Sequence, residues 1–172
     1  AWNKNGESVI STPVSATPGT HPHSVEELSA SPLLYSIKLY WMVPDTGGMD
    51  IEKFKIYRGD TIRSLHPHME VEPFGLKEQE IIDQDLIYNS DYFYAVSSIN
   101  AIGESKLSPI VSTSPYGAPS EPAMYDVEEE LDEFSLSWYP PEEDGGLPIA
   151  GYRFYYRFNT ETEWESLDQD EM

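Results

Sequence analysis

The chain has 172 residues, of which 31 are acidic and 10 are basic, so its formal net charge is -21. A field of that sign repels phosphate backbones and anionic lipid headgroups, which excludes nucleic acid and the membrane surface as expected partners. Cysteine is absent, which excludes a disulfide-held scaffold, and no run of 18 or more apolar residues suggests a membrane span.

The chain begins with an extended segment and a linker. Residues 9–15 are predicted to form a strand that Pro13 breaks, which suits a sheet edge because proline cannot donate to a ladder. Residues 16–24 contain Pro18, Gly19 and Pro22 and are typical of a short, semi-stiff linker.

Strands then follow one another through the middle of the chain. We expect a weak strand near residues 25–28 and a clear one at residues 35–41, where Tyr35, Ile37, Leu39 and Trp41 alternate with polar side chains. A turn at residues 45–48 leads to a strand in which Phe54 and Ile56 face inward.

The next part is less regular. Residues 59–77 are predicted to hold one short strand and a long loop, and residues 80–83 another strand. Tyr92, Tyr94, Val96 and Ser98 then lie on one face of an extended segment. The chain is expected to turn at Asn100 and Gly103.

A repeat of 97 residues organises the sequence. It relates Asn3, Gly6, Ser8 and Ser11 to Asn100, Gly103, Ser105 and Ser108, and Trp41 to Trp138. Pro18 and Pro22 recur at the same interval as Pro115 and Pro119. The repeat predicts that structural units of this length follow one another without a gap.

After a second linker at residues 112–122, an acidic stretch at residues 126–133 precedes a strand with Phe134, Leu136 and Trp138 on one face. Tyr152, Phe154 and Tyr156 alternate along the next strand, and Trp164 closes the segment after it.

These residues resemble the fibronectin type III family. Leu86 and Tyr92, six residues apart, look like that family's tyrosine corner, and Trp41 and Trp138 occupy the place of its B-strand tryptophan. Residues 137–152 are similar to its B strand, BC loop and C strand. The single Pro44 and the pair Asn89-Ser90 depart from the family pattern, although both still suit turns.

The resemblance implies an all-β fold: immunoglobulin-like β-sandwich modules in a linear tandem array. It divides the chain into the C-terminal strands of one module (residues 1–18), a complete module (19–115) and the A, B, C and C′ strands of a following module (116–172). The implied core comprises Trp41, Phe54, Ile56, Leu86, Tyr92, Tyr94, Val96, Trp138 and Tyr152.

Three motifs could each be a binding site, and each can also be interpreted as an ordinary turn, loop or solvated surface. Arg58-Gly59-Asp60 could engage an integrin, but its expected position after a strand favours a turn. His21, His23, His66 and His68 form two His-X-His pairs that could share a metal, although solvated loop histidines are the favoured interpretation. Acidic residues 126–133 and 142–144 could bind calcium, and a solvated face is favoured.

The sequence favours a non-enzymatic protein. It has no nucleophile elbow, no phosphate-binding loop and no expected cofactor. We expect a structural or adhesive spacer that binds other proteins through loops 45–50, 67–77 and 100–104 and through edge strands, and that contacts neighbouring modules.

Two alternatives are an accessory module of a larger secreted enzyme and an intracellular filament- or cilium-associated scaffold. The sequence does not fix the compartment, and we favour an extracellular or cell-surface location.

Overall fold

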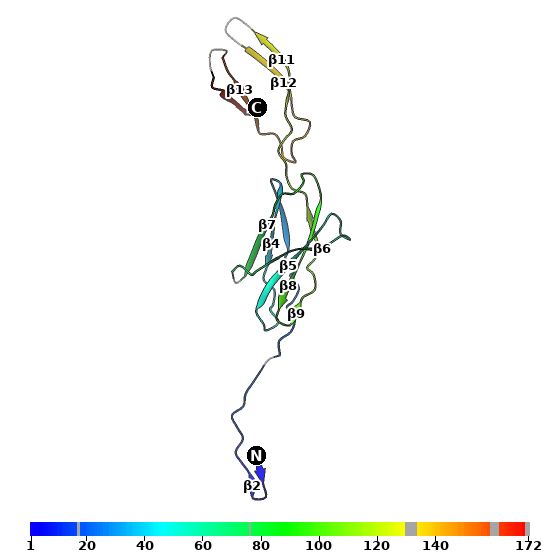
Figure 1. The fold of residues 1–172 in the computed structure, drawn as a ribbon, viewed down its shortest axis with the longest axis vertical. Coiled ribbons are helices and arrows are strands. Elements are labelled where there is room, and N and C mark those ends of the chain that lie inside the picture. Colours follow the sequence, from blue (N-terminus) through cyan, green and yellow to red (C-terminus); the bar gives the residue numbers. More distant parts are fainter. Residues whose placement is uncertain (17, 76, 130–133, 159–161, 171–172) are drawn as a thin grey trace.

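A computed structural model describes residues 1–16, 18–75, 77–129, 134–158 and 162–170. The regular elements in these ranges are all β-strands, and none of the described segments is a helix long and apolar enough to cross a membrane. The molecule is elongated, with a small hairpin at the N-terminal end, a sandwich in the middle and two hairpins at the C-terminal end (Figure 1).

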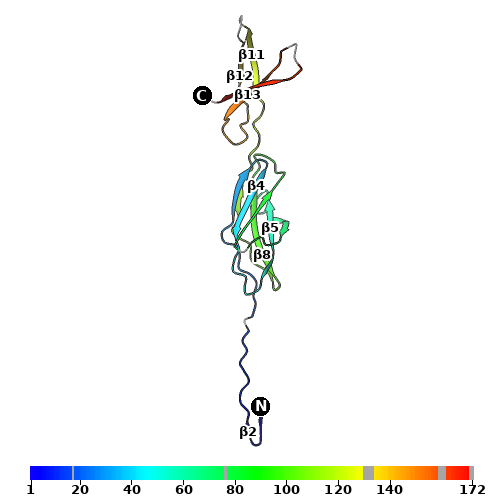
Figure 2. The same ribbon diagram turned by 90° about the vertical axis from the view of Figure 1, so that its left-hand side faces the viewer.

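The middle module consists of two antiparallel sheets that lie face to face (Figure 2). The first has the order β3-β4-β7, with bounds Ser29–Leu33, Ser36–Met42 and Glu78–Asp83. The second has the order β10-β8-β5-β6, and the short β9 also pairs with β8. The bounds in the second sheet are Val111–Thr113, Tyr92–Asn100, Ile51–Gly59, His66–Val71 and, for β9, Gly103–Glu104.

The core lies between these two sheets. Ile37, Leu39 and Trp41 are fully buried on β4 because their two-residue spacing places them all on the inner face. Trp41 packs edge-on against Phe54 of β5, with ring centroids 5.3 Å apart. The other fully or almost fully buried hydrophobic side chains are Val25, Leu28, Ile56, Leu86, Tyr94, Ala95 and Val96.

Two strand predictions at the start of the module were wrong. Residues 25–28 are not a strand, because Val25 and Leu28 both point into the core and a spacing of three does not fit a two-residue repeat. The ladder with β4 begins only where Ser29 faces Tyr40. Tyr35 does not belong to the inner face of β4, since it lies in the preceding turn with a φ of 48° and is exposed.

The segment between β5 and β7 is more regular than the sequence indicated. Strand β6 takes up residues 66–71, so the first part of the long loop expected at 67–77 is a strand. Strand β6 is an edge strand, which explains why Pro67 is tolerated within it.

The N-terminal hairpin repeats the end of the middle module's second sheet. Strands β1 (Trp2–Asn3) and β2 (Gly6–Glu7) pair as β8 and β9 do at Asn100 and Gly103. The backbone N–H of Ser8 donates to the Ala1 carbonyl at 2.8 Å, and that of Ser105 donates to Ser98 at 2.9 Å. The sequence repeat is therefore also a repeat of hydrogen bonds as far as Ser8. The strand predicted at residues 9–15 was wrong, because that segment is extended and exposed and pairs with none of the described strands.

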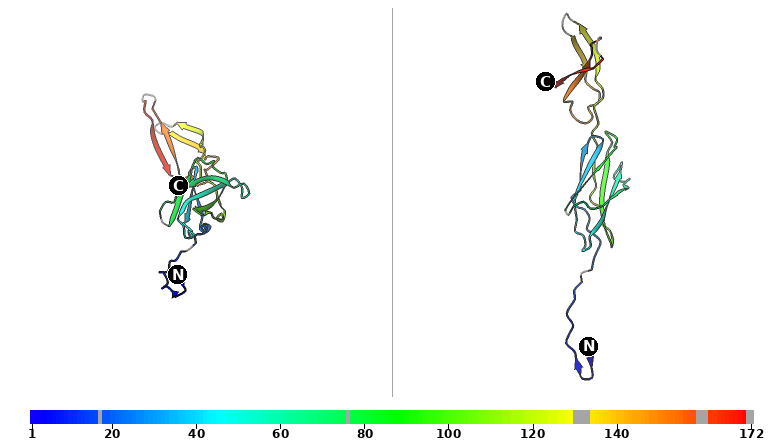
Figure 3. Two further views of the ribbon diagram at one scale, coloured as in Figure 1. Left: turned by 60° about the horizontal axis from the view of Figure 1, so that its bottom comes forward. Right: turned by 60° about the vertical axis from the view of Figure 1, so that its left-hand side comes forward.

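Two hairpins form the C-terminal segment: β11 with β12 (Ala123–Glu129, Phe134–Tyr139) and β13 with β14 (Gly151–Tyr156, Glu165–Asp170). They stand side by side in yellow and in orange to red (Figure 3). Trp138 lies 5.2 Å from Tyr152, centroid to centroid, as Trp41 does at 5.3 Å from Phe54.

The C-terminal segment differs from the sequence prediction in two places. Asp126 to Glu129, expected as an acidic connection, belong to β11, while residues 130–133 lie outside the described residues. The polar end beyond Leu167, for which no structure was predicted, continues β14 as far as Asp170.

The hairpins of the C-terminal segment enclose an open apolar groove of about 1140 Å³. Trp138 and Tyr152, expected in the core, are only partly buried in its wall, and Phe134 and Trp164 are exposed. The other apolar residues of the wall include Met124, Leu136, Phe154 and Leu167.

Candidate functional site

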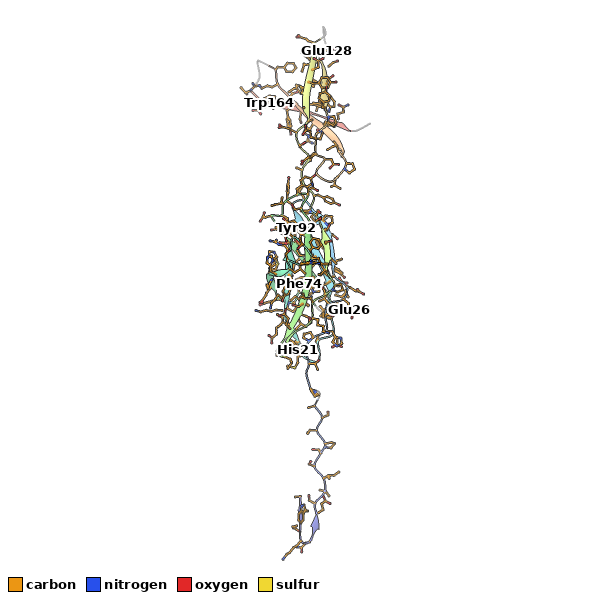
Figure 4. The ribbon with its side chains drawn as sticks, turned by 90° about the vertical axis from the view of Figure 1, so that its right-hand side faces the viewer. His21, Glu26, Phe74, Tyr92, Glu128 and Trp164 are labelled. Atoms are coloured by element: carbon orange, nitrogen blue, oxygen red, sulfur yellow. The ribbon has the colours of Figure 1, made fainter. Side chains whose placement is uncertain are left out.

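The two histidine pairs lie at different ends of the middle module and do not form one site. Arg58 pairs with His66 on one side and with Tyr94 on the other, so His66 lies near the start of β8. His21 packs against Gly103, beyond the end of β8. Figure 4 shows His21 at the lower end of the module and Tyr92 at the upper end.

His68 belongs instead to a polar cluster around Asp83. The Asp83 side chain is 5% exposed and accepts two hydrogen bonds from Arg58, at 2.9 and 3.1 Å, and one from the Tyr94 hydroxyl at 2.8 Å. The Nε2 of His68 lies 3.1 Å from Asp83 Oδ1. Since Asp83 is on β7 and its partners are on β6, β5 and β8, the cluster joins the two sheets.

This cluster sets the protonation of its members. Burial by itself would raise the pKa of Asp83, but the hydrogen bonds from Arg58, Tyr94 and His68 outweigh it and lower the pKa. Burial and the bond to Asp83 raise the pKa of Tyr94. Asp83 therefore stays a carboxylate and Tyr94 a neutral donor at neutral pH.

The Arg58-Gly59-Asp60 tripeptide is engaged within the module. Arg58 binds Asp83 and lies 5.7 Å from the Tyr92 ring centroid. Gly59 is buried, and a Cβ there would lie 2.8 Å from the Ser64 carbonyl oxygen. Asp60 accepts a hydrogen bond from the Ser64 hydroxyl. These contacts are those of a strand end and a turn.

Tyr92 forms the tie that the Leu86–Tyr92 spacing suggested. Its hydroxyl accepts a hydrogen bond from the backbone N–H of Ile87 at 3.1 Å, while Leu86 is 5% exposed. The ring is partly buried beneath Arg58. Tyr92 thus connects the start of β8 to the loop that precedes it.

The loops at the N-terminal end of the middle module are held by one amide side chain. Asn100 is 3% exposed; its Nδ2 donates to the carbonyls of Thr20 and Thr46 at 2.8 and 3.0 Å. Its Oδ1 accepts from Ile102 and Gly103 at 2.9 and 3.2 Å. The first linker and the loops at 45–50 and 100–104 therefore form one connected surface.

An ion-pair network covers the outer face of the second sheet. Glu104 accepts hydrogen bonds from the Ser97 hydroxyl at 2.6 Å, the Tyr57 hydroxyl at 2.7 Å and Lys55 Nζ at 2.9 Å. Led by the bond from Ser97, and against the effect of partial burial, these bonds lower the pKa of Glu104 to about 2. Glu104 thereby fastens β9 to the sheet.

The acidic stretches have separate positions. Asp126 and Glu128 lie on β11, whereas Asp144 accepts a hydrogen bond from the backbone N–H of Gly146 at 2.7 Å in the loop before β13. Among the described residues, no three His, Asp or Glu side chains are grouped so that they could hold a metal ion.

A junction connects the middle module to the C-terminal segment. The backbone N–H of Tyr116 donates to Leu33 at 2.9 Å, and its carbonyl accepts from Tyr35 at 2.8 Å. The N–H of Gly117 donates to Gly145 at 2.8 Å, and that of Ala118 to the Tyr35 hydroxyl at 3.0 Å. Both neighbours therefore bind the linker directly.

Known proteins resemble this chain over much of its length. It is 33% identical to Drosophila melanogaster titin over 138 residues, which is 77% of this chain and 1% of titin. It is 40% identical to human cardiac-type myosin-binding protein C over 75 residues, 42% of this chain and 6% of that protein. No family model matches the chain.

Among solved structures, the FN1–FN3 domains of chicken CNTN1 superpose on 90% of this chain and 56% of that one, with a TM-score of 0.53 and 15% identity. The likeness shows the fold and, together with the repeat, its modular arrangement. The chain is built from fibronectin type III-like modules. The all-β tandem sandwich expected from the sequence is confirmed.

Sequence reasoning missed two groups of contacts, one within the middle module and one at its junction with the C-terminal segment. Glu104 and its donors come from three strands, and Tyr35 and Ala118 are 83 residues apart in the chain. No local pattern marks such pairs. The sequence offered one signal for the junction: the glycine pairs Gly47-Gly48 and Gly145-Gly146 recur in equivalent loops.

Proposed function

We propose that this chain is a non-enzymatic structural or adhesive spacer within a longer chain of fibronectin type III-like modules. In this role it holds its neighbours in a fixed orientation and presents protein-binding surfaces. The observation that carries the proposal is the junction at residues 116–120, in which each backbone N–H has a partner on one neighbour or the other.

Every backbone N–H of residues 116–120 donates a hydrogen bond to one of the two neighbours. Tyr116 and Ala118 donate to the middle module, while Gly117 and Ser120 donate to Gly145 and Glu143 of the C-terminal segment. Pro119 has no N–H to donate. A hinge needs residues whose φ and ψ can change freely, and here such a change would break a backbone hydrogen bond.

Glycine permits the closest approach in this junction. Gly145 has a φ of 76°, and a Cβ there would lie 2.2 Å from the Gly117 carbonyl oxygen. A Cβ on Gly117 would lie 2.6 Å from Cγ of Tyr88. A side chain at Gly145 would separate the two backbones and release the hydrogen bond between them, whereas one at Gly117 would displace the Tyr88 ring of the middle module.

The module boundaries extend this proposal. Residues 1–18 repeat the end of the second sheet, residues 19–115 contain both sheets of the middle module, and residues 116–172 begin a further one. We infer that the apolar groove of the last segment receives strands equivalent to β7, β8 and β10, since those strands cover the corresponding face around Trp41.

Spin-label distances test the rigid junction. Because the chain has no cysteine, Glu52→Cys and Ser135→Cys place one label on β5 and one on β12, both at exposed positions. Double electron–electron resonance should give one narrow distance distribution, and Gly145→Val should broaden it. A distribution in the unmodified protein as broad as in that variant would refute the spacer proposal.

Gly48→Ala is the matched control for this experiment. Gly48 has a similar left-handed conformation, with a φ of 81°, but no atom lies within 4 Å of a Cβ built there. The substitution therefore imposes backbone strain without a clash at the junction. It should leave the distance distribution unchanged.

A further inference from the structure

One residue of the middle module has an exposed aromatic ring, while its backbone is hydrogen-bonded to a buried side chain. Phe74, in the loop between β6 and β7, is 79% exposed. Gln79, at the start of β7, is 3% exposed, and its side chain contacts the Phe74 backbone at both ends. Figure 4 shows Phe74 part-way along the middle module, away from the labelled residues at its two ends.

The contact is a reciprocal pair of hydrogen bonds. The Phe74 N–H donates to Gln79 Oε1 at 2.6 Å, and Gln79 Nε2 donates to the Phe74 carbonyl at 2.5 Å. The Gln79 side-chain amide thus pairs with both backbone polar groups of Phe74, as a neighbouring strand would. Beyond it, the Val43 N–H donates to the Lys77 carbonyl at 2.7 Å and closes the loop against β4.

This arrangement fixes the backbone that carries the ring, which a loop without these hydrogen bonds would not do. An exposed ring gives no folding stabilisation from burial, whereas the buried Gln79 amide must be fully paired to be tolerated. Binding through a fixed backbone loses less conformational entropy than binding through a mobile loop. Large aromatic side chains are also typical anchors of protein interfaces.

The charge beside the ring indicates the kind of partner. Glu72 and Glu78 are exposed on either side of Phe74 in the sequence, with one exposed cation, Lys77, between Phe74 and Glu78. Glu80 on β7 is already paired with Lys38 at 2.6 Å, so the local excess of negative charge comes from Glu72 and Glu78. The chain as a whole carries a net charge of -21. A pocket that accepts the ring would therefore be favoured by basic residues at its rim.

We propose that Phe74 anchors a docking surface for a partner protein that presents an apolar pocket bordered by Lys or Arg. Gln79 acts as a positioning residue that holds the anchor outward. The proposal rests on the protein-binding part of the proposed function, and it is independent of the rigid junction.

Amide hydrogen exchange in the 172-residue protein tests the positioning role. The Phe74 amide should be protected, and Gln79→Ala should speed its exchange at least tenfold. Glu78→Ala, at the neighbouring exposed position, should leave the rate unchanged. If the Phe74 amide of the unmodified protein exchanges as fast as an amide in an unstructured peptide, the positioning role of Gln79 is refuted.

Photo-crosslinking tests the partner. p-Benzoylphenylalanine is introduced at position 74 and, as a control, at position 62, where Ile62 is 59% exposed. In an extract of cells that express the protein, position 74 should crosslink to an apolar peptide segment flanked by Lys or Arg, and position 62 should not. A second copy of the chain, a lipid or an acidic segment as the product would overturn the proposal.

A competition experiment then measures how much Phe74 contributes to binding of the partner. Unlabelled protein should suppress the crosslink, Phe74→Ser should be at least tenfold weaker as a competitor, and Ile62→Ser should equal the unmodified protein. Phe74→Ser changes only an exposed ring, so its folding is preserved even where Gln79→Ala is not. Equal competition by Phe74→Ser would refute the docking surface, while a narrow spin-label distribution would still support the spacer.

Discussion

At the scale of single residues, the middle module is held by side chains that each satisfy backbone groups from other parts of the chain. Asn100 binds two carbonyls and two N–H groups, and Gln79 binds both polar groups of Phe74. Both side chains are almost fully buried. A buried amide is stable only when its polar atoms are paired, so each fixes the loop it contacts.

Tyr92 gives a prediction at this scale. Tyr92→Phe removes the acceptor of the Ile87 N–H and keeps the ring beneath Arg58. We expect the free energy of unfolding to fall by about 1 kcal/mol, the usual contribution of one such hydrogen bond. Urea unfolding followed by NMR signals of the middle module measures this, and an unchanged midpoint would mean that water replaces the hydroxyl without loss.

At the scale of elements, short strands depend on side chains from longer ones. Strand β9 pairs with β8 at only two positions, and Glu104 adds bonds to Ser97, Tyr57 and Lys55. Asp83 has the same role between the sheets, where it connects β7 to β5, β6 and β8. Charged groups therefore hold together elements that have few ladder bonds or none in common.

The lowered pKa of Glu104 predicts a dependence of stability on pH. A carboxyl whose pKa is lower in the folded state stabilises the protein above its unfolded pKa, and this contribution is lost as the pH falls toward the folded value. For Glu104 the loss extends from about pH 4.5 to about pH 2. Asp83 acts in the same direction below its ordinary pKa.

We therefore expect the urea midpoint of the middle module to fall between about pH 4.5 and about pH 2.5. Glu104→Gln should lower the midpoint near neutral pH and reduce its fall in acid, because the variant no longer titrates there. The remaining fall would come from groups such as Asp83. An acid dependence identical in the variant and the unmodified protein would contradict the role of Glu104.

At the scale of the whole molecule, two complete sheets give a closed core in the middle, and the two hairpins of the C-terminal segment leave a groove. Trp41 is fully buried and Trp138 is not, although Trp41 packs against one aromatic ring of the next strand, Phe54, and Trp138 against two, Tyr152 and Phe154. The difference lies in the strands that cover them. Around Trp41 these include β8, which supplies the buried Tyr94 and Val96.

The groove predicts binding of an apolar probe. Nile red, which is uncharged and so unaffected by the net charge, should show enhanced fluorescence with the 172-residue protein. Trp138→Ser should reduce the enhancement, because Trp138 lines the groove, whereas Tyr125→Ser is a control because Tyr125 pairs with Tyr139 outside the groove wall. Equal fluorescence in the two variants would contradict the assignment.

The sequence by itself determined the strands with strict alternation, such as Ile37, Leu39 and Trp41, and the recurrence of the whole unit. Both are local or periodic, and burial on one face of a strand imposes them directly. Only the tertiary structure decided that residues 25–28 are not a strand and that the histidine pairs are far apart. It also placed Glu104, Gln79 and Tyr35 against their partners, because those hydrogen bonds form between segments whose approach is set by packing.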